Sequence, residues 1–325
     1  MKVIIKIFKV LFSLVLVAVV FIGLVNLIPV YQVESTPFSK TTRTLISAHR
    51  GGGELNPENT KMAFDHVIKE TSYVDIVEFD IRMTKDEEAV IIHDKSINKF
   101  ALDEDKEEML LTDYTYEELK EYNLGYNFID REGNRPYKDL SINEAKEKGL
   151  TLMTLEEFLS EYKEVRDFLI YLEIKDKGEN AIKLAKLTLE LFSQNEYSWW
   201  KNRTMIISSD DDAIDYIASN DPSQYVGAVG FKIATAIAGD IFNIEPLFKP
   251  NFHCVQTAMK NKLGPITINS ATKSFVDSVH KHNQSIAYWD AKTKEDMELL
   301  VSLGADVLTV DAPDVLANIL NVEVK

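Results

Sequence analysis

Hydrophobic and polar positions follow several patterns along this chain, and the first is an unbroken apolar run. No charged residue occurs over positions 10–33, where most side chains are Leu, Val, Ile or Phe. A helix of about 20 such residues is long enough to cross the hydrocarbon core of a bilayer. The run therefore predicts one N-terminal transmembrane helix within residues 1–33.

Beyond this run, short apolar segments rich in Val and Ile alternate with amphipathic stretches of helical period. The short segments are apolar on both faces, which is typical of parallel strands covered by helices. They lie at positions 44–48, 74–81, 89–92, 168–174, 204–208, 225–231, 253–257, 285–289 and 305–310. The helical stretches include 59–70, 181–192, 271–282 and 294–303. This alternation favours an α/β fold with a parallel sheet.

Nine strand-like segments are one more than an eight-stranded barrel contains. The link at 85–88 is too short for a parallel crossover, which takes a dozen or more residues. The segments 74–81 and 89–92 are therefore not an ordinary strand–helix unit, and the topology of this pair stays open.

Two segments depart from the alternation. Residues 34–43 are mostly polar and contain Pro37, which predicts a short stalk. Residues 95–152 are strongly charged and then aromatic, which predicts an insertion that is either a solvated excursion or a lid over substrate. The expected organisation is a basic start and membrane anchor at 1–33, a stalk at 34–43, and a catalytic barrel at 44–325 with its insertion at 95–152.

Charge excludes some functions and orients the chain. The formal net charge of −16 argues against binding of DNA or RNA, which requires clustered Lys and Arg. Lys2, Lys6 and Lys9 precede the apolar run and Glu34 is the first charge after it, which predicts a cytoplasmic amino terminus and an extracellular catalytic domain at the cell membrane. A cleaved signal sequence is the alternative, but the run is longer than such signals need, and positions 26–32 lack a small-x-small site.

The candidate chemistry lies at the ends of predicted strands, where a barrel places its active site. Glu78 and Asp80 are two residues apart on one strand and point to the same face. With Glu173 on a later strand they would offer three carboxylates to a divalent cation, and all-oxygen ligation suits Mg²⁺ or Ca²⁺. The alternative is that these acids form ion pairs with Arg50, Arg82 or Lys175.

Two histidines and two cationic side chains also lie at the ends of predicted strands. His49 and His93 could each act as a general acid or base near neutral pH. Arg50 and Lys175 could hold an anion. Three carboxylates, one divalent cation and these two side chains leave one positive charge, which suits a singly charged phosphate diester.

The chain resembles the glycerophosphodiester phosphodiesterase family in a series of motifs. The segment HRGGGELNPENTKMAF at 49–64 resembles the family's opening motif, and EFD at 78–80, VIIHD at 90–94, YLEIK at 171–175 and TVDAPD at 309–314 resemble later ones. The resemblance implies a TIM (β/α)8 barrel with an insertion after the second histidine. It also implies a metal on Glu78, Asp80 and Glu173 and an acid–base pair of His49 and His93.

The resemblance further implies phosphate contacts from Arg50 and Lys175 and a substrate-side tryptophan at Trp289. Three positions depart from the family pattern: Glu87 replaces a glycine, Asp290 a threonine, and the segment 208–210 reads Ser-Ser-Asp instead of Ser-Phe. The last two lie near the expected substrate side and leave the substrate's identity open.

The expected function is metal-dependent hydrolysis of a glycerophosphodiester to an alcohol and glycerol 3-phosphate. Lysophospholipase D activity and trimming of glycerol-phosphate polymers at the cell envelope are enzymatic alternatives. A non-catalytic receptor for phosphate esters is the alternative of another class. The sequence leaves open the choice between Mg²⁺ and Ca²⁺, the role of each histidine, and the oligomeric state.

Overall fold

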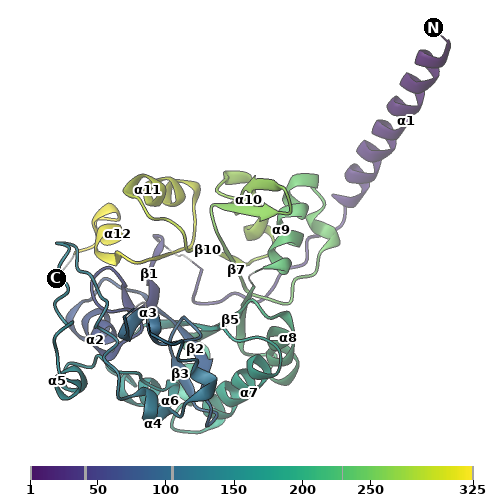
Figure 1. Ribbon diagram of the computed structural model, residues 1–325. Coiled ribbons are helices and arrows are strands. Elements are labelled where there is room, and N and C mark those ends of the chain that lie inside the picture. Colours follow the sequence, from purple (N-terminus) through teal and green to yellow (C-terminus); the bar gives the residue numbers. More distant parts are fainter. Residues whose placement is uncertain (1, 40–41, 104–105, 229, 324–325) are drawn as a thin grey trace.

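A closed barrel of eight parallel strands forms the body of the protein, as seen in a computed structural model that describes residues 2–39, 42–103, 106–228 and 230–323 (Figure 1). Neighbouring strands pair in parallel around the ring, and β1 closes it by pairing with both β2 and β11. In ring order the strands are β1 (Leu45–Ala48), β2 (Ile76–Met83), β4 (Leu169–Ile174), β5 (Thr204–Ser208), β6 (Tyr225–Ala228), β7 (Cys254–Thr257), β10 (Ser285–Tyr288) and β11 (Val307–Val310). The predicted TIM-barrel fold is confirmed.

Helices cover the outside of the barrel and shield the apolar outer faces of its strands (Figure 1). Several begin at a side chain that caps the first turn: Thr154 accepts a hydrogen bond from the Glu157 amide, and Asp210 accepts one from the Ala213 amide. The helices of the barrel are α2 (Lys61–Asp65), α6 (Leu155–Glu161), α7 (Glu179–Ser193), α8 (Asp211–Asn220), α9 (Phe231–Phe242), α10 (Lys273–Lys281), α11 (Lys294–Leu303) and α12 (Pro313–Ile319). Short helical turns that bear on the site or on the surface are η1 (His49–Gly51) and η5 (Glu245–Leu247).

The surplus ninth segment is an antiparallel addition to the barrel. Strand β3 (Ala89–Ile91) pairs with the end of β2, with Ile91 opposite Ile81. A turn at 84–88 joins the two strands, as the short link requires. A separate hairpin, β8 (Lys260–Leu263) with β9 (Ile266–Asn269), follows β7 and was not predicted, because its side chains are mostly exposed and carry no buried apolar run.

The insertion at 95–152 folds around a small hydrophobic core of its own. Its elements are α3 (Asn98–Ala101), η3 (Leu111–Asp113), α4 (Tyr116–Leu119) and α5 (Ile142–Glu147). Buried Phe100, Leu119 and Leu124 pack there against Val90 and Ile92 beside the barrel. The segment is therefore a packed subdomain attached to β3 rather than a solvated loop.

The segment between the apolar helix and the barrel runs along the amino-terminal end of the barrel. The Val33 amide donates to the His282 carbonyl at 2.9 Å. Phe38 is fully buried inside that end of the barrel and stacks on Tyr171, with ring centroids 5.1 Å apart. The part of the predicted stalk around Phe38 therefore packs into the barrel instead of acting as a free spacer.

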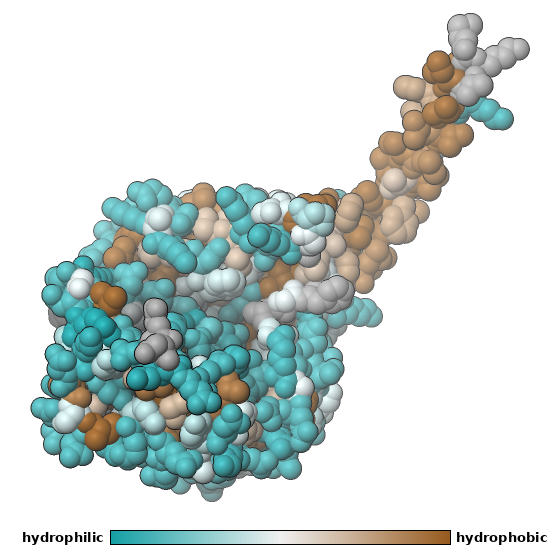
Figure 2. Space-filling view, in the orientation of Figure 1, coloured by the Kyte–Doolittle hydropathy of each residue, from teal (hydrophilic) through white to brown (hydrophobic). Residues whose placement is uncertain are grey.

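The apolar helix α1 (Lys2–Val25) projects away from the barrel (Figure 1). Most of its apolar side chains over Ile4–Leu24 are exposed and contrast with the hydrophilic surface of the body (Figure 2), whereas Val25 at its end is buried. Over Ile4–Val25 it is long and apolar enough to cross a membrane, a property that it shares with signal sequences. At its end, Asn26 donates to the Asn243 carbonyl just after α9, at 2.9 Å.

Candidate active site

Three carboxylates meet where β2 and β4 run side by side. Glu78 and Asp80 are on one face of β2, and Glu173 on β4 is the register partner of Asp80. One oxygen from each lies within 4.8 Å of the others. Glu78 and Asp80 are buried and Glu173 is partly exposed, so the cluster is open on one side.

The donor set of this cluster fits a hard divalent cation. All three side chains offer carboxylate oxygens, the ligands that Mg²⁺ and Ca²⁺ prefer. Asp80 Oδ1 is buried and has no hydrogen-bond partner among the described residues, although the Lys175 ammonium lies 3.2 Å away. A buried carboxylate oxygen of this kind is costly without a cation.

Burial and mutual repulsion place the carboxylates in different ionisation states. Burial, together with the charge of Asp80, raises the pKa of Glu78 to about 7. Burial also acts to raise the pKa of Asp80, but Lys175 and Arg50 outweigh it and lower that pKa. Without a bound cation the cluster therefore does not hold its full negative charge at neutral pH.

The ion-pair alternative is realised only in part. Lys175 Nζ lies 2.9 Å from Glu173 Oε1, and Arg50 Nε lies 3.4 Å from Asp80 Oδ2. Arg82, the third cation considered, pairs instead with Asp176 at 2.6 Å. Two cations thus face the carboxylates, and both are also placed to meet an anion above them.

A left-handed turn after β1 aims two groups at the carboxylates. Arg50 has φ 53°, and its amide donates to Glu78 Oε2 at 2.8 Å. Its guanidinium donates to Glu58 at 2.8 Å, so one carboxylate that the sequence-based charge count left out already faces this cation. Asn59, also at positive φ, donates to Asp80 Oδ2 at 3.0 Å.

Each of the two histidines has a carboxylate partner. His49 Nδ1 lies 2.6 Å from Asp311 Oδ1, at the end of β11, and His93 Nδ1 lies 2.6 Å from Asp94 Oδ1. Burial acts to lower the pKa of His49, but the carboxylates of Glu78 and Asp311 raise it overall. A carboxylate on Nδ1 holds the other ring nitrogen, Nε2, ready to exchange a proton.

Seven of the eight predicted site residues line one cavity of about 580 Å³ at the carboxyl ends of the strands. Asp80 lies beneath it with no exposed surface, and Trp289, 50% exposed, stands at its edge. The structure thus brings all eight predicted site residues together. The residues that line the cavity are His49, Arg50, Gly53, Glu54, Glu58, Glu78, His93, Glu173, Lys175, Ser209, Gln256, Trp289, Lys292, Thr309 and Asp311.

Sequence reasoning assigned no role to several of these residues. Gln256 on β7 and Thr309 on β11 line the cavity, and Gln256 Nε2 and Thr309 Oγ1 are buried without a hydrogen-bond partner among the described residues. Lys292 adds a third cation. The polar ends of β7 and β11 would have identified Gln256 and Asp311, because they follow the same strand-end rule as the residues that were chosen.

The three departures from the family pattern have structural roles. Glu87 adopts φ 63° in the β2–β3 turn, the conformation that favours the usual glycine. Asp290 accepts from the Met259 amide at 2.8 Å, and Asp210 accepts from the Gly178 amide at 2.8 Å. Of the departing residues, Ser209 alone lines the cavity.

The sequence profile of the glycerophosphoryl diester phosphodiesterase family matches residues 49–315, which include every site residue described above. The chain belongs to this family. One similar protein is a glycerophosphodiester phosphodiesterase from Bacillus altitudinis, 24% identical over 83% of this chain and 96% of the relative. A second, from Caldanaerobacter subterraneus, is 25% identical over 86% of this chain and 98% of the relative.

Solved structures share the fold. A phosphodiesterase from Oleispira antarctica, in complex with the product sn-glycerol-3-phosphate, superposes with a TM-score of 0.61 at 16% identity. The match covers 86% of this chain and 97% of that one. Family membership thus agrees with the barrel and with the motifs that carry its strand-end residues.

Proposed function

We propose that this protein is a metal-dependent glycerophosphodiester phosphodiesterase that hydrolyses its substrate to glycerol 3-phosphate and an alcohol. The observation that carries the proposal is the meeting of Glu78, Asp80 and Glu173, with an imidazole from each of two other segments, in one open cavity. The relatives named for this activity and the product bound in the Oleispira antarctica structure support it.

Glu78, Asp80 and Glu173 would hold the divalent cation. When bound, such a cation supplies charge stabilisation to the phosphoryl oxygens. Arg50 and Lys175 would contact the same oxygens, with Lys175 already 2.9 Å from Glu173. These fixed positive groups stabilise the negative charge that grows on the phosphate in the transition state.

His49 and His93 would divide the proton transfers. One imidazole accepts a proton from the attacking hydroxyl, whose oxygen forms the new bond to phosphorus. The other gives a proton to the alcohol oxygen as its bond to phosphorus breaks. The attacking hydroxyl belongs either to water or to the neighbouring glycerol group, which would first give a cyclic phosphate. Asp311 and Asp94 orient the two rings.

The proposed setting is the outer face of the cell membrane. The three lysines at the start of α1, Lys2, Lys6 and Lys9, and the acidic Glu34 after it favour a cytoplasmic amino terminus and an extracellular barrel. The segment that follows α1 meets the barrel at Asn243 and His282, which lie at the amino-terminal ends of the strands. The catalytic cavity is at the opposite, carboxyl-terminal end.

This placement favours one of the alternatives over another. A cavity turned away from the anchor suits a soluble glycerophosphodiester or a glycerol-phosphate polymer in the cell envelope. A lysophospholipid embedded in the same membrane would have to leave the bilayer and cross the height of the barrel.

The test is hydrolysis by the full-length chain in nanodiscs, with and without EDTA. The substrates are glycerophosphocholine, a lysophospholipid and a poly(glycerol phosphate). The product is assayed as glycerol 3-phosphate, or as lysophosphatidate where the substrate is the lysophospholipid. We expect release that EDTA stops and that Glu173→Ala lowers by orders of magnitude. Binding of phosphate esters without turnover of any substrate would instead identify a receptor.

A further inference from the structure

Three exposed apolar side chains form a corner of the barrel beside the end of the apolar helix. Ile241 and Phe242 are the last residues of α9 and are 54% and 60% exposed. Leu247, the last residue of η5, is 47% exposed. Large apolar side chains grouped on a surface mark a contact with a partner or a membrane.

The corner is tied to the end of α1. Asn26 Nδ2 donates both to Ile22 O, in the last turn of α1, and to Asn243 O, each at 2.9 Å. Phe242 is the residue before Asn243. Phe242 is therefore held close to the end of the helix.

A second set of contacts holds the same end of the barrel near the helix. His282 Nδ1 lies 2.7 Å from Tyr31 O, and Asn283 donates to the Val33 carbonyl at 2.9 Å. The chain between α1 and these contacts is only a few residues long. The barrel therefore has little freedom to swing its α9–η5 corner away from the helix.

We propose that Ile241, Phe242 and Leu247 rest in the head-group layer of the same bilayer that α1 spans. The inference depends on α1 being a membrane anchor, which is part of the proposed function. With Val25 at the outer edge of the hydrocarbon, residues bonded to Asn26 lie at the interface. Apolar side chains at that level lose their contact with water by entering the lipid.

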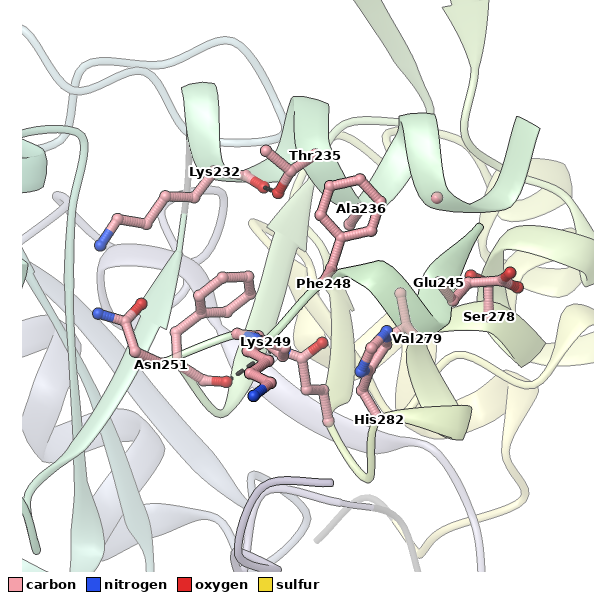
Figure 3. Close-up of a pocket in the computed structure, with 14 residues that line it drawn as sticks. Lys232, Thr235, Ala236, Glu245, Phe248, Lys249, Asn251, Ser278, Val279 and His282 are labelled. Carbon is pink, nitrogen blue, oxygen red and sulfur yellow. Dashed lines mark hydrogen bonds between the residues drawn. The ribbon is translucent and has the colours of Figure 1, made fainter. Parts of the chain in front are cut away.

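The corner is built rigidly enough to present these side chains. Glu245 is buried in η5 and accepts from Lys281 of α10 at 2.7 Å. Beneath the surface lies a cavity of about 240 Å³ between α9 and α10, and Figure 3 shows the Phe248 ring beside Ala236 within it. Phe248 thus turns inward to the cavity while Leu247, its neighbour, is exposed.

The lipid that fits this corner is zwitterionic. The net charge of −16 opposes attraction to an anionic surface. Lys249, exposed just after η5, is placed to meet a phosphate of the head group. A phosphatidylcholine surface therefore suits the corner, and the contact would fix the barrel with its catalytic end away from the membrane.

The test places an environment-sensitive fluorophore on the full-length chain in phosphatidylcholine vesicles. The label is attached at Phe242→Cys or, as a control, at Ile129→Cys. Ile129 is 62% exposed and lies in the insertion, between α4 and α5. Figure 1 shows both helices on the side of the barrel away from α1. The native Cys254 is fully buried and stays unlabelled.

We expect a blue-shifted emission at position 242, with quenching by doxyl-labelled lipid several-fold stronger than at position 129. Equal quenching at the two positions in chains that float with the vesicles would overturn the proposed contact. Failure of the chains to float would overturn it as well, through loss of the anchor. Hydrolysis measured on the same vesicles reports the proposed activity separately, since neither labelled residue belongs to the catalytic cavity.

Discussion

His49 Nδ1 and Asp311 Oδ1 lie 2.6 Å apart, although the two residues are separated by 262 positions in the chain. His49 follows the first strand of the barrel and Asp311 follows the last. These strands are neighbours because the barrel closes between β1 and β11. Closure of the fold therefore sets the orientation of one of the two candidate catalytic imidazoles.

We predict that Asp311→Asn lowers kcat by about 10- to 100-fold, as for other groups that orient a functional histidine. Asp311 is among the groups that raise the pKa of His49, so the variant's His49 pKa should fall. If His49 is the base, the acid limb of the pH–rate profile moves to lower pH; if it is the acid, the alkaline limb does. A profile that does not move would contradict the orienting role, with Asp94→Asn as the matched variant at His93.

We predict that Lys175→Met destabilises the cation-free protein by about 2–4 kcal/mol, because the buried carboxylates lose their nearest positive partner. A bound Mg²⁺ or Ca²⁺ would replace the missing positive charge beside these carboxylates, and it binds only the folded state. The added cation should therefore raise the melting temperature of the variant more than that of the wild type. The control is Lys183→Met, which removes an exposed pair with Glu87 and should change stability by less than about 0.5 kcal/mol. Equal cation-induced shifts in wild type and Lys175→Met would count against a shared site.

We predict that Phe38→Ala lowers the free energy of unfolding by about 3–5 kcal/mol, the usual cost of deleting a buried phenyl ring. Phe38 has no exposed surface and stacks on Tyr171. Guanidinium unfolding of the full-length chain in detergent measures the change. Ile129→Ala, at an exposed position, should cost less than about 0.5 kcal/mol. A similarly small loss for Phe38→Ala would mean that the segment is not packed in the barrel.

We predict that the stabilising effect of Asp65 depends on pH. Burial acts to raise the pKa of Asp65, but hydrogen bonds from Lys61, Lys69 and Tyr162 outweigh it and lower that pKa. A carboxyl with a lowered folded-state pKa stabilises the protein above its ordinary pKa and loses that effect as the pH falls through the lowered value. At pH 7 the wild type should therefore be more stable than Asp65→Asn by about 1 kcal/mol and have the higher melting temperature. The two melting temperatures should converge in acid. A difference that stays constant with pH would contradict the assignment.

Much of the barrel was predictable because its strands are buried on both faces. Each of the eight parallel strands coincides with a short apolar run. The link at 85–88 correctly indicated that 74–81 and 89–92 are not an ordinary strand–helix unit, although it left their pairing open. The β8–β9 hairpin was missed because its side chains are exposed and leave no apolar signal. Phe38 was missed because one aromatic residue in a polar segment does not show where it packs.

The site residues were predictable where they lie at the ends of strands or match family motifs. Glu78, Asp80 and Glu173 follow from spacing, and the structure gathers them within 4.8 Å. The strand-end rule would have identified Asp311 as a site residue, but its pairing with His49 depends on the closed ring, and the pairing of Glu58 with Arg50 depends on the turn after β1. Such contacts are tertiary and are not encoded in local sequence.

Calorimetric titration of the full-length chain with Mg²⁺ and Ca²⁺ tests the central claim most directly. The account predicts one divalent cation per chain in the wild type and an affinity lowered by about 100-fold or more in Glu173→Gln, because a ligand oxygen loses its charge. Glu179→Gln, at a position that is 83% exposed on α7, should bind as the wild type does. Unchanged cation binding by Glu173→Gln, or no binding by the wild type, would contradict the account.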